Sequence, residues 1–427
     1  MRTIGNRLIL SSVLVAASLM AAGAVGTAAS ASTHKAKIGT ITIGTLYAST
    51  GGFAAVSMPQ YAGLQFWVKT INASGGVYVK PLKKKEKVKL IAYNDQSDPA
   101  TATVLYNQLI TQNHVDLLAA DFGSVLTAPA ITIARNNKRL LFDQTGSGTV
   151  FFNSGANPYV VLSSIPVSSE WPKPVVSLLR GLKANRVAIL YGQNDFDQAQ
   201  ATTIDNLLLQ SGVTPVYYQG VPTSQSDYSS LVQSISATNP DAVLEFGYTN
   251  NDIAFLNQLA SINMHFKFLL TVFPSQLPAL FAKVVGTNGL AYTYTYAVPP
   301  TLLINKVNIG LGMTKFSSAY LASNPGSMSY SAIAGYNTGL VIQAALANAK
   351  SMTQLGIRAG VTAVSGKMQT LIGTFRVDNT GEQLGELFPI GQMIPSGGGI
   401  VMKMVYPGTP AQASLLTGSP QYPAPTN

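Results

Sequence analysis

The chain has 427 residues, enough for two or three domains of ordinary size. Charged residues make up only 10% of it, and the formal net charge is +10. Because the sequence holds no cysteine, disulfides, thiolate catalysis and cysteine-held zinc or iron–sulfur sites are excluded.

Residues 1–31 have the pattern of a signal peptide. Arg2 and Arg7 precede an apolar run over residues 8–25, and small residues follow up to Ala29-Ser30-Ala31, a cleavage pattern. We therefore expect a periplasmic or otherwise extracytoplasmic protein, secreted through this leader and not a lipoprotein. The alternative is an uncleaved membrane anchor, because the run of about 18 residues approaches a spanning length.

Strand and helix patterns alternate over residues 38–120. Strands are predicted at 38–46, 88–93 and 116–120, where apolar residues cluster between turn signals. A helix runs from Ser57 to Gly75-Gly76, and Asp98 and Pro99 supply the N-cap and first position of the next helix. Strands that alternate with helices of this length predict crossover connections and a parallel sheet.

A second, similar series starts near residue 186. It has predicted strands at 186–191, 213–218 and 242–246 with helices at 198–210 and 228–235. After Pro299-Pro300 come a helix at 333–349 and strands at 373–377 and 399–405. Residues 409–427 are rich in Pro, Gly and Ser, which predicts a disordered tail. The two series suggest two lobes of related architecture.

One dense run of lysines lies just before the strand predicted at 88–93. A basic run can bind nucleic acid, but a solvated strand edge protected by lysines explains it more simply. The run consists of Lys80, Lys83, Lys84, Lys85, Lys87 and Lys89.

Five motifs follow one another along the chain, namely Ile43-Gly44, Thr50-Gly51-Gly52-Phe53, Ile71-Asn72-Ala73-Ser74-Gly75-Gly76-Val77, Asn94-Asp95-Gln96-Ser97-Asp98-Pro99 and Gly373-Thr374-Phe375-Arg376-Val377-Asp378. Taken in this order, they resemble the periplasmic branched-chain amino acid (Leu/Ile/Val)-binding family, the substrate-binding components of ABC transporters.

The resemblance implies an α/β fold of the type I periplasmic binding protein class. In this fold, two Rossmann-like lobes with parallel central sheets are joined by a three-strand hinge. Lobe 1 would hold residues 36–165 plus 297–367, and lobe 2 residues 166–296 plus 368–408. Such receptors bind a small molecule in the cleft and deliver it to membrane permease subunits, and we expect this chain to be a monomer. No cofactor and no nucleic acid partner are implied.

The loops at the carboxyl ends of parallel strands line the crevice in such folds. The resemblance assigns ligand-binding hydroxyls to Ser124, Thr145 and Ser147, because short hydroxyls donate to a carboxylate. Four aromatic residues would close over the ligand or form its walls. Helix capping or turn formation by the hydroxyls, and core packing by the rings, are the simpler alternatives. The aromatic residues are Phe196, Tyr248, Phe122 and Phe53.

The sequence departs from the family where the acid that pairs with a ligand ammonium is expected. The matching position is Val272. Because an unpaired buried ammonium is costly, either Asp195, Asp121 or Asp252 replaces this acid, or the ligand lacks an amine. Related receptors bind amides, urea and aromatic acids, so the identity of the ligand stays open.

Enzyme interpretations are weaker than a binding role. Residues 360–367 have the wrong glycine spacing for a phosphate-binding loop, and residues 146–148 lack the frame of a nucleophile elbow. His34, His114 and His265 are far apart, which favours surface histidines over a metal site. Asp195 and Asp197 could serve a secreted hydrolase, but solvated loop acids are a simpler interpretation. We expect a protein that is not an enzyme, and a ligand sensor of the same fold is the alternative.

Overall fold

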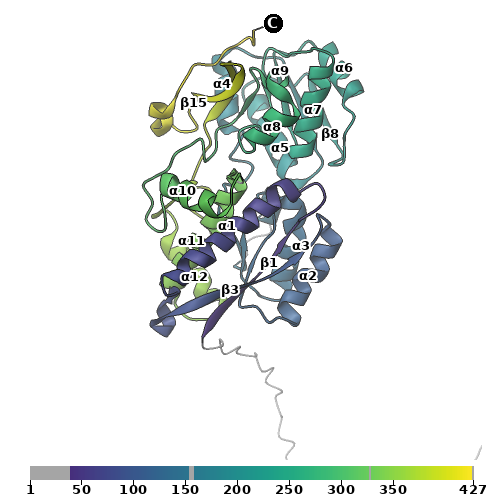
Figure 1. The fold of residues 1–427 in the computed structure, drawn as a ribbon. Coiled ribbons are helices and arrows are strands. Elements are labelled where there is room, and N and C mark those ends of the chain that lie inside the picture. The colour runs from purple at the N-terminus through teal and green to yellow at the C-terminus, as the bar shows by residue number, and fades with distance from the viewer. Residues whose placement is uncertain (1–38, 153–157, 327, 426–427) are drawn as a thin grey trace, which may run out of the picture. The chain divides into compact units, whose positions relative to one another are not determined.

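The structure is a computed structural model that describes residues 39–152, 158–326 and 328–425 (Figure 1). The predicted signal peptide at 1–31 and His34 lie outside these residues. Within the described ranges, no helix is both long enough and apolar enough to cross a membrane.

The first half of the described chain builds a six-stranded sheet. Its order is β2-β3-β1-β4-β5-β6, and every neighbouring pair is parallel except β2–β3. Strand β1 lies between β3 and β4, with Thr40 opposite Lys87 and Ile43 opposite Leu117. The strands are β1 (Thr40–Tyr47), β2 (Val77–Val79), β3 (Lys84–Asn94), β4 (Leu117–Ala119), β5 (Leu141–Asp143) and β6 (Val160–Leu162).

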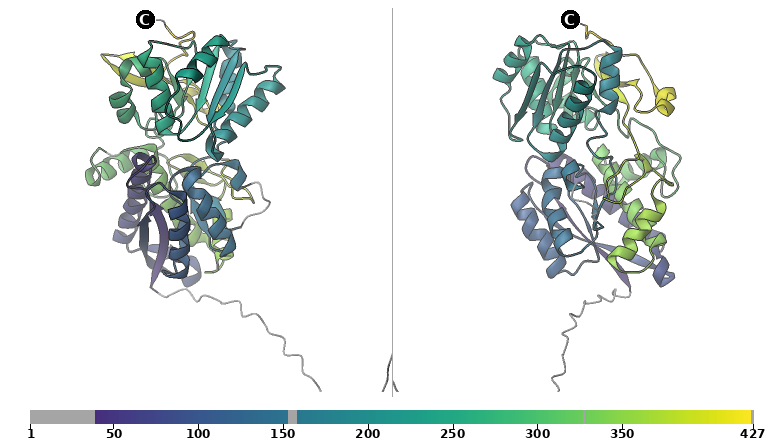
Figure 2. Two further views of the ribbon diagram at one scale, coloured as in Figure 1. Left: turned by 90° about the vertical axis from the view of Figure 1, so that its right-hand side faces the viewer. Right: turned by 180° about the vertical axis from the view of Figure 1, so that it is seen from behind.

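Helices cover both faces of this sheet, with α1 and α11 on one side and α2 and α3 on the other (Figures 1 and 2). Asp98 caps α2 as predicted, since its side chain accepts the Thr101 N–H at 2.6 Å. A Cβ on Gly63 would lie 1.9 Å from the Ala332 carbonyl oxygen, so α1 and α11 touch through backbone. The helices are α1 (Ala54–Ala73), α2 (Pro99–Thr111), α3 (Gly123–Asn136), α10 (Met313–Ser323), α11 (Tyr330–Asn348) and α12 (Gln354–Val364).

A seven-stranded sheet follows, with the order β15-β14-β11-β10-β9-β7-β8. The pairs from β8 to β11 are parallel, whereas β14 and β15 add as antiparallel strands. The strands are β7 (Val187–Gly192), β8 (Tyr217–Val221), β9 (Ala242–Phe246), β10 (Leu269–Leu270), β11 (Tyr294–Tyr296), β14 (Ile390–Ser396) and β15 (Gly399–Tyr406). Its helices are α4 (Lys173–Gly181), α5 (Asp195–Gln210), α6 (Ser229–Ala237), α7 (Thr249–Ser261), α8 (Pro278–Val284) and α9 (Gly286–Leu290).

The chain passes between the two lobes three times. It leaves the six-stranded sheet after β6 and leaves the seven-stranded sheet after β11. Helices α11 and α12 then pack on the first lobe, and the chain returns to the second sheet as β14. A short hairpin, β12 (Met368–Thr370) with β13 (Gly373–Phe375), precedes this return. Two of the crossing segments meet, because the Val167 N–H donates to the Gln383 carbonyl at 2.9 Å.

The lysine run lies on the β2–β3 hairpin at the edge of the first sheet. The six lysines are exposed, and Lys84 pairs with the buried Glu86 at 2.7 Å. Lys85 and Lys87 donate to the carbonyls of Ser74 and Asn72 at the end of α1. These contacts agree with a solvated strand edge that also caps a helix.

The described part of the tail that was expected to be disordered, residues 409–425, makes contacts with the second lobe in this structure. Residues 410–415 form a short 3₁₀ helix, and Gln421 exchanges two hydrogen bonds with the side chain of Gln392 on β14. The Ala424 N–H donates to the Lys267 carbonyl at 2.9 Å. These polar partners are distant in sequence, so composition alone does not indicate them.

Candidate functional site

A small pocket lies where side chains of the two lobes meet. Its cavity volume is about 20 Å³, room for about one water molecule. Phe122 and Thr145 follow strands of the six-stranded sheet, whereas Phe196 and Tyr248 follow strands of the seven-stranded sheet. The pocket therefore sits at the carboxyl ends of both sheets, where open α/β folds bind ligands. It is lined by Phe122, Gly123, Thr145, Ile165, Trp171, Phe196, Tyr248, Phe273, Gln276 and Tyr330.

Tyr248 connects the two lobes across this pocket. Its hydroxyl accepts the backbone N–H of Ser124, in the first turn of α3, at 3.0 Å. Its ring stacks on Phe196 at a centroid distance of 5.6 Å and meets Phe53 edge-on at 5.1 Å. Burial raises the pKa of Tyr248, so the hydroxyl is neutral around pH 7.

Other donors at the start of α3 also have partners within the protein. The Gly123 N–H donates to Thr145 Oγ1 at 2.9 Å, and the Thr145 hydroxyl donates to Gln60 Oε1 at 2.8 Å. Ser124 Oγ accepts the Gly148 N–H at 3.0 Å. The free N–H groups of a helix N-terminus attract anions, but here hydroxyls of the protein occupy them.

Two glycines allow the lobes to approach closely. Gly123 has φ of +74°, and a Cβ there would lie 3.0 Å from the Tyr248 hydroxyl. A Cβ on Gly148 would lie 2.5 Å from the Cβ of Asp195, at the start of α5. A side chain at either position would therefore hold the lobes apart.

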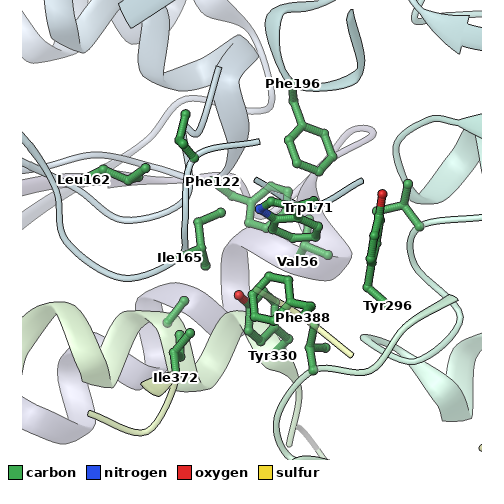
Figure 3. Packing of buried hydrophobic residues seen from close by; sticks show 14 of the residues in the cluster. Val56, Phe122, Leu162, Ile165, Trp171, Phe196, Tyr296, Tyr330, Ile372 and Phe388 are labelled. Carbon is green, nitrogen blue, oxygen red and sulfur yellow. The ribbon is translucent and has the colours of Figure 1, made fainter. Parts of the chain in front are cut away.

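Trp171 lines the pocket and also lies at the centre of an aromatic cluster that extends behind it (Figure 3). Its ring meets Phe196, Tyr296 and Phe388 edge-on, at centroid distances of 5.3, 5.3 and 4.8 Å. The indole N–H donates to the Pro166 carbonyl at 2.9 Å. The indole thus has its polar atom satisfied and its ring packed against other aromatic rings.

The residues predicted from the sequence fall into two groups. Phe122, Thr145, Phe196 and Tyr248 line the pocket together. Ser124, Phe53 and Ser147 do not line it. Ser124 instead holds Tyr248 and Gly148, and Phe53 packs against the Tyr248 ring.

Ser147 lies buried behind the pocket wall. Its carbonyl accepts the N–H and the hydroxyl of Ser168, at 2.9 and 2.7 Å. Its own hydroxyl has no hydrogen-bond partner among the described residues. The structure thus places Ser147 in the connection between the lobes.

Besides Gly123, which lies between the predicted Phe122 and Ser124, five lining residues were missed by the sequence reasoning. Phe273 and Gln276 follow β10 directly, and the strand-end rule that selected Tyr248 applies to them equally. Ile165 and Trp171 lie on a crossing segment, and Tyr330 begins α11. No local pattern could identify these three, because their position depends on how the lobes are connected.

Position 272, where the family has an acid, carries a buried apolar residue. Val272 is fully buried, and its carbonyl accepts hydrogen bonds from Thr295 and Gln276. The proposed substitute acids lie elsewhere. Asp252 accepts the Phe273 N–H at 2.6 Å from behind the wall, and Asp121 accepts the Ser57 hydroxyl at 2.5 Å. Neither acid, nor Asp195, lines the pocket.

Buried carboxyl groups occur behind both walls. Burial raises the pKa of Asp121, and the neighbouring Asp95 raises it further. In the second lobe, burial raises the pKa of Glu245 to about 7, while burial and Glu245 together raise the pKa of Asp252. Charged carboxylates without cationic partners are unfavourable in such places, so these groups keep their protons to a higher pH than they would in water.

Asp197, one of the two acids that a hydrolase could use, has a structural partner. Asp197 is buried and accepts the Asn194 amide at 2.5 Å, within the capped start of α5. Among the described residues, no group of three His, Cys, Asp or Glu side chains is arranged to hold a metal ion.

Two α/β lobes joined by three crossings, with a pocket at the facing strand ends, define a solute-binding type of architecture. The chain belongs to the periplasmic binding protein family, whose sequence model matches residues 40–398. This match confirms the resemblance seen in the sequence motifs.

Curated relatives have matching descriptions at low identity. The Leu/Ile/Val/Thr-binding protein of Salmonella typhimurium is 22% identical over 236 residues, which cover 55% of this chain and 62% of the relative. The amino acid binding protein of Pseudomonas aeruginosa is 25% identical, covering 52% and 56%. The chain thus matches little more than half the length of these relatives.

Solved structures share the fold over most of the chain. A leucine binding protein, LivK of Thermotoga maritima, superimposes with a TM-score of 0.72 at 16% identity, covering 86% of this chain and 99% of that one. A solute binding protein of R. palustris, in complex with benzoate, gives a TM-score of 0.70 at 15% identity, covering 85% and 95%. At such identities the likeness confirms the predicted fold class and nothing finer.

Proposed function

We propose that this chain is the extracytoplasmic solute-binding receptor of an ABC importer. It captures a small polar ligand, of the amino acid, amide or carboxylate type and including aromatic ones, and delivers it to membrane permease subunits. The observation that carries the proposal is the pocket lined from both lobes, with Tyr248 of one lobe bonded to Ser124 of the other. Family membership and the binding roles of the relatives support it.

Capture in this proposal is reversible and involves no chemical step. The lobes, taken as 36–165 plus 297–367 and 166–296 plus 368–408, open at the crossing segments. Ligand contacts the first lobe near Phe122 and Thr145, and the second lobe then closes with Phe196 and Tyr248. A ligand shifts this equilibrium only by its greater affinity for the closed state.

The proposal also includes a cleaved leader, a monomeric receptor, no cofactor and no nucleic acid partner. The permease subunits are separate polypeptides that recognise the closed form.

Native mass spectrometry of the purified protein, followed by a thermal-shift screen of amino acids, amides and carboxylates, tests the proposal. We expect a retained small molecule or a clear rise in melting temperature with one of these classes, because a ligand that binds the folded state stabilises it. The recovered ligand should be chemically unchanged. A chemical product, or a protein that none of these molecules stabilises, would contradict the proposal.

A further inference from the structure

The lining of the pocket carries no charged group. Of its ten residues, six are aromatic, and the polar side chains are the hydroxyls of Thr145, Tyr248 and Tyr330 and the amide of Gln276. No Asp, Glu, Lys, Arg or His side chain is among them. A charged ligand would therefore lose its hydration without gaining an ionic partner, which is costly in a buried site.

The donors that a carboxylate would use already have partners. The N–H groups of Gly123, Ser124 and Gly148 are bonded to Thr145, Tyr248 and Ser124. A carboxylate could reach the Ser124 N–H only by displacing the Tyr248 hydroxyl. That ring lies within 6.4 Å, between centroids, of Phe53, Phe122, Phe196 and Phe273, so moving it disrupts four aromatic contacts.

One polar atom of the lining lacks a partner. The Tyr330 side chain is 2% exposed, and its hydroxyl makes no hydrogen bond to any described residue. The ring packs near Trp171 and Phe388, and in Figure 3 the hydroxyl is turned to the side on which Ile165 lies. Buried hydroxyls usually have a partner, so this one is available to a ligand.

The walls of the pocket limit the ligand further. The cavity between them is about 20 Å³, room for about one water molecule, so a ligand is admitted only when the lobes open. Aromatic walls such as those of Trp171 and Phe196 favour a flat, apolar guest. Resting on the proposed receptor function, we infer that the ligand is an uncharged molecule with a single aromatic ring and one polar group that hydrogen-bonds to Tyr330.

Isothermal titration calorimetry of the purified full chain at neutral pH, with two pairs of similarly shaped probes, tests this inference. Benzamide is compared with benzoate, and benzyl alcohol with benzylammonium, while L-leucine serves as the amino acid reference. We expect each uncharged probe to bind at least about tenfold more tightly than its charged counterpart. Equal or tighter binding of benzoate, benzylammonium or leucine would overturn the inference and leave the receptor proposal intact.

The role of Tyr330 is tested with Tyr330→Phe. The variant should weaken benzamide binding about five- to tenfold without lowering the melting temperature, because the lost hydroxyl has no partner in the protein. Tyr296→Phe is the matched control, since the Tyr296 hydroxyl is also buried without a partner but its side chain does not line the pocket. Unchanged benzamide affinity in Tyr330→Phe overturns the assignment.

The two proposals can fail separately. If neither uncharged probe binds, the inference is wrong, whatever the charged probes do. The receptor proposal is then judged by its own experiment, because a different small molecule retained by the purified protein would still support it.

Discussion

The Tyr248 hydroxyl and the Ser124 N–H, 124 residues apart in sequence, form a 3.0 Å hydrogen bond that joins the two lobes. Ser124 belongs to the first turn of α3, whose N–H groups have no partner within the helix. Tyr248 immediately precedes α7 on the other lobe. The pair gives the closed pocket a protein contact that does not depend on a ligand.

Tyr248→Phe should lower the free energy of unfolding by about 1–3 kcal/mol, because the Ser124 N–H loses its acceptor in a buried place. Urea unfolding of the ligand-free protein measures the change. Tyr78→Phe is the matched control. Tyr78 is 45% exposed, so removing its hydroxyl should leave the free energy of unfolding nearly unchanged. Equal effects of the two substitutions would mean that the bridge does not stabilise the protein.

Thr145→Val and Ser147→Ala should have different effects on ligand affinity, although both hydroxyls were predicted to bind the ligand. Thr145 lines the pocket, so its loss should weaken binding of the best ligand from the thermal-shift screen by about 1–3 kcal/mol. Ser147 does not line the pocket, and its loss should leave affinity within about 0.5 kcal/mol. Calorimetry on both variants measures the difference, and a larger effect at Ser147 would contradict the assigned site.

Gly63→Ala should destabilise the first lobe by about 1–3 kcal/mol, because the added Cβ would overlap the Ala332 carbonyl and push α1 from α11. Gly181→Ala, at the end of α4, is the control. A Cβ there meets no atom within 4 Å, so the substitution should be neutral or slightly stabilising. Thermal unfolding of the two variants distinguishes close helix contact from a general effect of losing glycine.

Stability should fall as the pH rises from about 4.5 to about 7. The pKa of Glu245 is raised by burial from 4.5 to about 7, so the folded state keeps a proton that the unfolded state releases. Below about pH 4.5 both states hold this proton and the full stability is present, and the contribution is lost as the pH passes about 7. Urea unfolding at several pH values measures the slope.

Glu245→Gln should reduce this pH dependence, because a neutral amide has no proton to release. Asp227→Asn, at an exposed carboxylate, should leave the fall in stability in place. A free energy of unfolding that stays flat or rises over the same range would show that Glu245 does not ionise as described.

Local patterns predicted most of the fold. The strand expected at 242–246 has the bounds of β9, and the Asp98 cap of α2 was read directly from Asp98-Pro99. The strand expected at 213–218 is instead β8, Tyr217–Val221, because pairing with β7 fixes its position and short-range pattern does not.

The pocket was predictable only in part. Strand-end positions identified Phe122, Thr145 and Tyr248, since parallel strands bring their carboxyl ends to one edge. Trp171 reaches the pocket on a crossing segment. Tyr330 reaches it at the start of α11, a late helix that packs against the early helix α1. Their contribution is a property of long-range packing, which a single sequence does not reveal.

The contact between α1 and α11 has a consequence for folding during synthesis of the chain. Trp67 Nε1 bonds to Gln343 Oε1 across 276 residues, and Gly63 meets Ala332 across a similar separation. While the ribosome is still producing the middle of the polypeptide, α1 has no α11 to cover its apolar side. The first lobe must therefore wait for a late segment of the nascent chain, a closure over long sequence distance that slows folding and leaves an aggregation-prone surface bare.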